Sequence, residues 1–206
     1  MDPARISELL RPYLGDSDLT ARQLGYISTY IDVLSKWNAR MNLTAIRDPE
    51  EMVRRHFGES LFAARNLVSP DSTITAADVG SGAGFPGIPL KIFAPELRVT
   101  LIEAHGRKAT FLREVIRTLK LIDIDAFRDR AEKWGQTADL VVLRAVEKFE
   151  TVLPIAASLV APGGRLGLLI GQDQGPIAKE LLSGNWQSPI PIPETAKKVL
   201  QVWSRP

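Results

Sequence analysis

The stretch Asp78–Gly87, which reads DVGSGAGFPG, decides the fold of this chain. Its glycines come directly after the apolar run Thr73–Val79, and a second apolar run, Ile88–Phe93, follows at once. Glycine allows a sharp turn and a close approach of the backbone to a ligand, and a helix that begins there offers free amide groups. A purely structural turn is the alternative, but three alternating glycines between a strand and a helix favour a ligand.

Short apolar runs and amphipathic runs alternate along the rest of the chain. Such alternation is typical of βαβ units, which build a mostly parallel sheet with helices on both faces, so we expect an α/β fold. The expected strands are Thr73–Val79, Arg98–Glu103, Ile122–Phe127, Asp139–Arg144, Arg165–Ile170 and Lys197–Trp203. The expected helical segments between them are Ile88–Phe93, Arg107–Leu119, a short turn from Arg130, and Lys148–Val160.

The first third of the chain is helical in character. Apolar residues recur at helical spacing over Pro3–Gly15 and again from about Asp18. The segment Asp48–Glu51 opens a third helix with the cap, proline and glutamate spacing of a capping box. We therefore expect a helical extension over residues 1–70 and a cofactor-binding core over residues 71–206, joined in one compact unit.

The glycine turn fits two classes of nucleoside cofactor. Residues 82–87 match the dinucleotide pattern G-x-G-x-x-G, and Glu103 follows about 20 residues later, as that pattern expects. Asp78 favours the other class, because a carboxylate just before the first glycine would repel a pyrophosphate and suits a sulfonium or an amino group. Pro86 also stands where we expect the dinucleotide pattern to need close packing of helix on strand. We therefore favour S-adenosylmethionine and keep an NAD-linked oxidoreductase as an alternative.

Glu103 ends the expected second strand, where an acidic side chain can accept hydrogen bonds from both ribose hydroxyls. The alternative interpretation is that Glu103 is a solvent-exposed charge at the end of a strand and binds no ligand. The residues expected to contact the cofactor on these grounds are Asp78, Gly80, Ser81, Gly82, Gly84 and Glu103.

Composition excludes several classes of function. The 206 residues are 45% hydrophobic, enough for a core of their own. The chain has no cysteine and only two histidines, which excludes disulfides and thiolate chemistry and leads us to expect no metal site. No apolar run reaches the length of a membrane span, and Met1–Pro3 lacks the character of a signal peptide, so we expect a cytosolic protein that does not bind membranes.

Several motifs narrow the function further. The runs GFPGIP at residues 84–89 and NLTAI at residues 42–46 are the most specific. The other segments are Trp37-Asn38, Arg55-His56, Ser60-Leu61, Asp78–Gly82, Arg107-Lys108, Phe111-Leu112, Arg130–Glu132, Arg144-Ala145 and Pro162–Leu166. With them the chain resembles the bacterial 16S ribosomal RNA guanine-N7 methyltransferases (RsmG, also called GidB), from about residue 26 to the end of the fifth strand.

This resemblance implies a class I methyltransferase fold, which is Rossmann-like, with a mostly parallel seven-stranded sheet and the helical extension over part of the active-site face. It implies S-adenosylmethionine as the cofactor and N7 of a guanine in 16S ribosomal RNA, free or within the 30S particle, as the methylated atom. We expect a monomer. The family's cofactor positions carry over to Gly80, Phe85, Ala131, Glu132 and Arg144.

The chain departs from the family at two positions. Ile170 stands before Gly171 where the family usually has a lysine, and Glu59-Ser60 replaces its usual Asp-Ser. Loss of the lysine would remove a cation near the RNA or the transferred methyl group. Two other functions therefore stay open, a methyltransferase for a small molecule or a protein, and a non-catalytic regulator that binds S-adenosylmethionine.

Transfer to guanine N7 needs no general base, because this nitrogen carries an in-plane lone pair and no proton. Catalysis then depends on alignment, and the residues expected to position the substrate are Asn42, Arg130 and Arg144. Each has a structural alternative, and Asn42 would serve equally to close the turn after the second helix. His56, beside two arginines, is more typical of a helix surface than of an RNA contact.

Overall fold

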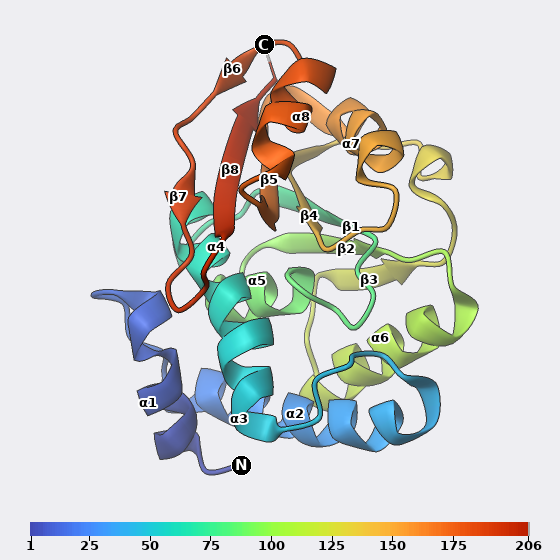
Figure 1. Ribbon diagram of the computed structural model, residues 1–206. Helices are drawn as coiled ribbons and strands as arrows, with labels where there is room; N and C mark the ends of the chain where they lie inside the picture. The colour runs from blue at the N-terminus through green and yellow to red at the C-terminus, as the bar shows by residue number, and fades with distance from the viewer. Residues whose placement is uncertain (206) are drawn as a thin grey trace.

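An eight-stranded sheet forms the centre of the computed structural model, which describes residues 1–205 (Figure 1). The strands are β1 (Thr75–Val79), β2 (Arg98–Ile102), β3 (Ile124–Phe127), β4 (Ala138–Arg144), β5 (Val160–Gly171), β6 (Asn185–Trp186), β7 (Ile190–Pro191) and β8 (Lys198–Ser204). Their order is β3-β2-β1-β4-β5-β8-β6, and β7 also pairs with β8. The first five strands are parallel, whereas β8 runs antiparallel to its neighbours. The α/β class is confirmed; the expected count of seven strands is wrong, because two short segments, β6 and β7, both pair with β8.

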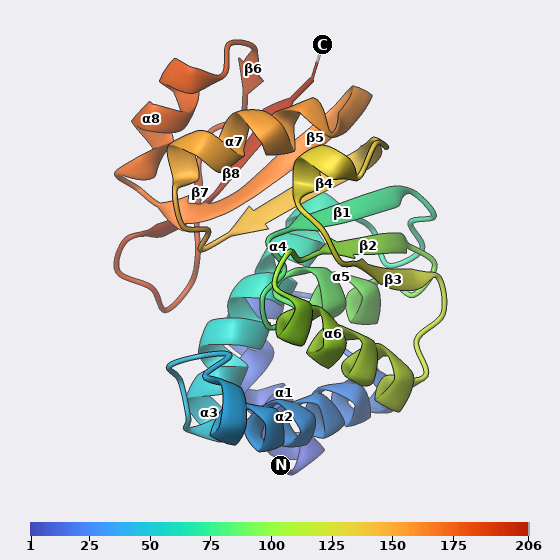
Figure 2. The same ribbon diagram turned by 90° about the vertical axis from the view of Figure 1, so that its right-hand side faces the viewer.

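Helices cover both faces of this sheet. They are α1 (Pro3–Leu14), α2 (Ala21–Met41), α3 (Pro49–Met52), the π-helical η1 (Val53–Gly58), α4 (Glu59–Leu67), α5 (Gly87–Phe93), α6 (Gly106–Leu119), the 3-10 turn η2 (Ala131–Lys133), α7 (Phe149–Ser158) and α8 (Gln174–Leu181). In Figure 2, α7 and α8 lie on one face, α4, α5 and α6 on the other, and α1 and α2 form a further layer beneath α6. The helix α8 has no counterpart among the expected elements. Over residues 1–205, every helix falls short of the length or the hydropathy that a membrane span requires.

Two apolar clusters fill the spaces on either side of the sheet. One joins α1, α2, α4, α5 and α6 to one face of the strands, and the other joins α7 and α8 to the opposite face. Within the first, Trp37 of α2 packs edge-on against Phe111 of α6, with ring centroids 5.7 Å apart. Since the helices of residues 1–70 and the strands share this cluster, a division of the chain at residue 70 stays a prediction.

Local hydrogen bonds set where the first helices begin. The second helix begins at Ala21 rather than near Asp18, because Thr20 and Gln23 form a reciprocal capping box. The side chain of Gln23 accepts the N–H of Thr20 at 2.8 Å. Asp48 caps the third helix as predicted, accepting a backbone N–H of its first turn at 2.8 Å.

Gly58, at the end of η1, allows the ring of Tyr13 on α1 to lie directly against the helix backbone. A Cβ on Gly58 would lie 2.6–2.8 Å from three ring carbons of Tyr13, which is fully buried and has little room to move. We expect Gly58→Ala to lower the free energy of unfolding by about 1–3 kcal/mol, the usual cost of overpacking.

Gly25→Ala on α2 is the matched control, because a Cβ there meets nothing within 4 Å. This change should raise the free energy of unfolding by roughly 0.5–1 kcal/mol. Urea unfolding of both variants measures the two effects. A Gly58→Ala protein as stable as the unaltered chain would contradict the packing of Tyr13 described above.

Candidate functional site

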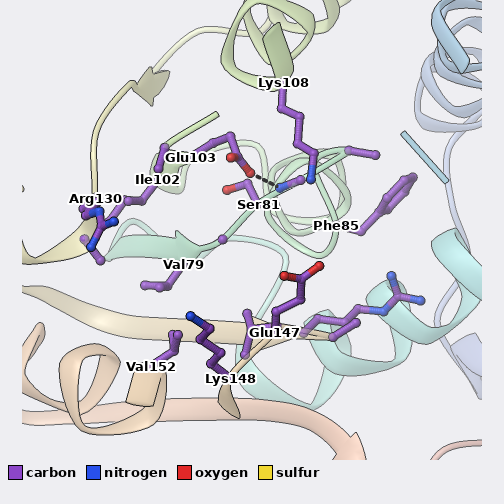
Figure 3. Close-up of a pocket in the computed structure, with 18 of the residues that line it drawn as sticks. Val79, Ser81, Phe85, Ile102, Glu103, Lys108, Arg130, Glu147, Lys148 and Val152 are labelled. Carbon is purple, nitrogen blue, oxygen red and sulfur yellow. Dashed lines mark hydrogen bonds between the residues drawn. The ribbon is translucent and has the colours of Figure 1, made fainter. Parts of the chain in front are cut away.

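A cavity of about 650 Å³ lies at the carboxyl ends of β1, β2 and β4, the edge at which parallel sheets bind ligands (Figure 3). The glycine turn after β1, the loop after β4 and the loop between α2 and α3 all contribute to its walls. The lining residues with polar or aromatic side chains include Thr44, His56, Ser81, Phe85, Glu103, Lys108, Arg130, Glu132, Arg144, Glu147 and Lys148. The helical first third of the chain therefore supplies part of the site.

The glycine turn after β1 has a backbone conformation that side-chain-bearing residues adopt poorly. Gly80, Gly82 and Gly84 have φ values of 73°, 56° and 88°. Gly84 has the least space, because a Cβ there would lie 2.3 Å from the hydroxyl oxygen of Tyr30. That hydroxyl donates to the carbonyl of Ala83 at 2.5 Å. Tyr30 belongs to α2, so this hydrogen bond connects the helix to the glycine turn. Of the three glycines expected to contact the cofactor, Gly80 and Gly82 line the cavity and Gly84 does not.

Asp78 lies behind the glycine turn and not in the cavity. It is 1% exposed, its Oδ2 accepts the N–H of Gly87 at 2.9 Å, and its Oδ1 has no partner within residues 1–205. The expected contact between this carboxylate and the cofactor is therefore corrected, since Asp78 holds the turn from inside the protein. A Cβ on Gly87 would lie 2.7 Å from the same Oδ2. Gly87 thus provides the close packing of helix on strand, and the argument from Pro86 against a dinucleotide was wrong.

Burial raises the pKa of Asp78 to about 7, against the opposing effect of the Gly87 N–H. Because the unfolded chain releases this proton near pH 4, the free energy of unfolding should fall as the pH rises from about 4 to about 7. The variant Asp78→Asn keeps an acceptor for Gly87 but cannot titrate. In it, the decrease in the free energy of unfolding with pH should be smaller by about 2–4 kcal/mol. Urea unfolding at pH 5 and pH 8 tests the prediction, and any pH-independent cost of the substitution cancels in the comparison. Parallel pH profiles for the two proteins would refute it.

Glu103 follows β2 and faces the cavity, where Figure 3 shows it beside Ser81. Its Oε2 accepts the N–H of Gly82 at 2.9 Å, and its Oε1 accepts the N–H of His105 at 2.7 Å. These bonds fix the carboxylate against the glycine turn. Each oxygen keeps a second lone pair, so the carboxylate can still accept hydrogen bonds from a ligand's hydroxyl groups.

The loop after β3 brings three of the expected site residues to the cavity, Arg130, Ala131 and Glu132. Asn42 lies elsewhere. It is exposed, ends α2 with φ 47°, and accepts a hydrogen bond from Arg47 at 3.3 Å. Asn42 does not line the cavity and ends α2 as a helix cap, so its role in positioning the substrate stays a prediction.

Arg144, the last residue of β4, reaches the cavity from a buried ion-pair cluster. Its Nη2 lies 2.9 Å from Oε2 of Glu59 and donates to the carbonyl of Arg55 at 2.8 Å. Lys198 of β8 places Nζ 2.8 and 2.9 Å from the two oxygens of the same carboxylate. Burial would raise the pKa of Glu59, but the charges of Arg144 and Lys198 outweigh it and hold that pKa below its ordinary value. The guanidinium is therefore fixed in place at the edge of the cavity.

His56 lies in η1 and is buried, so its interpretation as a helix-surface residue was wrong. Its ring stacks on Phe85 with centroids 4.8 Å apart, and its Nε2 lies 2.7 Å from Oγ1 of Thr44. Burial, followed by the charge of Arg144, lowers the pKa of His56 to about 3. The ring is therefore neutral near pH 7. The sequence reasoning missed Thr44 altogether, although it belongs to the NLTAI run.

The chain matches known proteins over most of its length. A profile of the GidB family, described as rRNA small subunit methyltransferase G, matches residues 23–181. A ribosomal RNA small subunit methyltransferase G from Chloroflexus aggregans is 42% identical over 161 residues, which cover 75% of this chain and 67% of the relative. One from Stenotrophomonas maltophilia is 37% identical over 200 residues, covering 94% and 92%. The chain belongs to this family.

Solved methyltransferase structures share the fold of this family member. A ribosomal protein L11 methylase from Lactobacillus delbrueckii subsp. bulgaricus superposes with a TM-score of 0.62 at 16% identity, covering 74% of this chain and 80% of that one. P. horikoshii TYW2, in complex with MeSAdo, gives a TM-score of 0.58 at 17% identity, covering 73% and 62%. At such identities the likeness shows the fold alone, which is the class I methyltransferase fold.

As an rRNA small subunit methyltransferase G family member, the protein is a methyltransferase with S-adenosylmethionine as its methyl donor. The cavity fits this cofactor by its donor set. The turn at Gly80 and Gly82 brings backbone close to the cavity, Glu103 offers a carboxylate for hydroxyl groups, and the turn at Ala131 and Glu132 offers further backbone groups.

The family departure at Ile170 lies outside this cavity. Ile170 is 4% exposed and packs in the apolar cluster beneath α7 and α8. The second departure, Glu59, is the buried carboxylate that holds Arg144. The two departures from the rRNA small subunit methyltransferase G pattern therefore leave the polar lining of the cavity intact.

Proposed function

We propose that this protein transfers the methyl group of S-adenosylmethionine to N7 of a guanine in small-subunit ribosomal RNA. The family relation supports the class of substrate, since the relatives are named for the small-subunit RNA. The finer assignment to N7 is supported by the chemistry of the end of the cavity formed by Thr44, His56, Phe85 and Arg144.

The observation that carries the assignment is the set of contacts around the buried ring of His56, where a hydroxyl and a guanidinium lie against its two nitrogens. Burial and the charge of Arg144 lower its pKa to about 3, which makes this imidazole a poor proton acceptor. Arg144 beside it can only donate hydrogen bonds. This end of the cavity therefore suits a nucleophile that brings a free lone pair and no proton, which describes guanine N7.

The chain's own residues supply position and electrostatics. The bound cofactor supplies an electrophilic methyl group on a sulfonium, which N7 accepts directly to give a cationic base. Phe85, stacked between His56 and Tyr30, is held rigidly and borders this end of the cavity. Arg144, fixed by Glu59, offers a preorganised donor group. Alignment of this kind can contribute about 7–11 kcal/mol to the lowering of the barrier.

The surroundings of the cavity support an RNA partner. Lys108 of α6 lies at the cavity together with Arg130 in the loop after β3 and Lys148 in the loop after β4 (Figure 3). Cations at the cavity can neutralise phosphates, which predicts salt-dependent binding. We further propose that the protein acts in the cytoplasm as a monomer, on 16S ribosomal RNA or on the 30S particle.

Transfer of labelled methyl groups to 30S particles from cells that lack this protein tests the proposed function. The matched control is the 50S particle from the same cells. We expect label in 16S ribosomal RNA and none in the 50S RNAs. Label that enters proteins or small molecules instead would overturn the RNA assignment, and tight cofactor binding with no transfer would indicate a regulator.

A further inference from the structure

Thr44 is held rigidly at the cavity by α2. The side-chain amide of Asn38, which is 3% exposed, accepts the backbone N–H of Thr44 and donates to its backbone carbonyl, both at 2.9 Å. Thr44 lines the cavity together with His56 and Arg144. The position of its hydroxyl oxygen is therefore set by the fold.

The neighbours of His56 decide which of its ring nitrogens carries the hydrogen. Nδ1 faces the guanidinium of Arg144, with Nη1 and Nη2 both 3.5 Å away. Arginine has donors and no acceptor, so a hydrogen on Nδ1 would point at a cation. The hydrogen of the neutral ring therefore sits on Nε2, which donates to Oγ1 of Thr44 at 2.7 Å.

The hydroxyl of Thr44 is thereby left as a donor. Oγ1 accepts the Nε2–H of His56, and it also accepts the backbone N–H of Ile46 at 3.1 Å. A hydroxyl has two lone pairs and one hydrogen, and these two bonds use both lone pairs. The hydrogen has no acceptor among residues 1–205, and the residue borders the cavity.

A guanine places two acceptors side by side on one edge, N7 and O6, whereas adenine places an amino donor beside its N7. We propose that the Thr44 hydroxyl donates to O6 of the target guanine while N7 receives the methyl group, and so selects guanine over a purine with an amino group at that position. This inference rests on the proposed function. His56 and Arg144 contribute to the selection of guanine indirectly, because their contacts leave the Thr44 hydroxyl only a donor role.

The test combines two enzyme variants with two substrates. Thr44→Val removes the hydroxyl with little change of shape, and Thr44→Ser keeps it. Once the methylated position is mapped, 16S ribosomal RNA is assembled by splint ligation with either guanine or 2,6-diaminopurine there, which exchanges O6 for an amino group and keeps N7. We expect Thr44→Val to lower kcat/KM on guanine by about 10- to 100-fold and on diaminopurine by less than about threefold.

Thr44→Ser should stay within about threefold of the unaltered protein on both substrates, and the cofactor Kd should be the same in all three proteins. An equal loss on guanine and diaminopurine, or a Thr44→Ser protein as impaired as Thr44→Val, would overturn the role of the hydroxyl. Failure of the unaltered protein to methylate guanine at all would instead overturn the proposed function.

Discussion

Gly84→Ala should raise the Kd for S-adenosylmethionine by about 100-fold. Two costs add at this position. An alanine at φ 88° is strained by roughly 1–2 kcal/mol, and its Cβ would lie 2.3 Å from the Tyr30 hydroxyl, an overlap that costs about 1–3 kcal/mol to relieve. The turn must move to relieve them, and this displaces the backbone that borders the cavity. A sum near 3 kcal/mol corresponds to about 100-fold in affinity.

Gly163→Ala is the control, because it has the strain without the overlap and lies outside the cavity. Its φ is 74°, and a Cβ there meets nothing within 4 Å. We expect its Kd to stay within about threefold of the unaltered protein, because strain of roughly 1 kcal/mol at Gly163 does not displace the glycine turn. Calorimetric titration of the cofactor measures both variants. Equal losses of affinity would show that the contact with α2 does not shape the turn.

Arg144→Ala should lower kcat/KM on the ribosomal RNA substrate by about 100- to 1000-fold, the range seen when a preorganised donor is removed from an active site. Because Arg144 lines the cavity and is also an expected cofactor position, the assay is run with saturating S-adenosylmethionine, so that the loss reports on the reaction with RNA. The free energy of unfolding should also fall by about 2–3 kcal/mol, since Glu59 loses one of its cations and keeps Lys198.

Arg55→Ala is the control for this change. Arg55 also pairs with Glu59, at 3.3 Å, but its side chain is 44% exposed and does not line the cavity. It should reduce kcat/KM by less than about threefold. Single-turnover assays with both variants separate the chemical step from binding. If Arg55→Ala lost as much activity as Arg144→Ala, the guanidinium would have no special role in the cavity.

The sequence predicted the parallel sheet and the glycine turn because both depend on local patterns. Alternating apolar runs follow the two- and 3.6-residue periods of strands and helices, and glycines mark positive φ. A local argument misplaced His56, because a surface position was expected from its two arginine neighbours. The segment Val53–Gly58 is π-helical, and the His56 side chain within it is buried.

Contacts between distant segments account for the other errors at the site. Glu59 and Lys198 are 139 residues apart, and the hydroxyl of Tyr30 lies against the carbonyl of Ala83. No local pattern records such pairs. The carboxylate of Asp78 was expected in the cavity because the sequence does not show its partner. In the structure it accepts the N–H of Gly87 and lies behind the turn.

The identity of the methylated base decides whether guanine N7 accepts the methyl group. Small-subunit particles from cells lacking this protein would be incubated with it and S-adenosylmethionine, and the nucleosides of their 16S ribosomal RNA analysed by mass spectrometry. We expect about one 7-methylguanosine per RNA molecule with the unaltered protein, and a strongly reduced yield with Arg144→Ala. Methyl groups found on another atom or another base, or an equal yield from Arg144→Ala, would overturn the assignment to guanine N7.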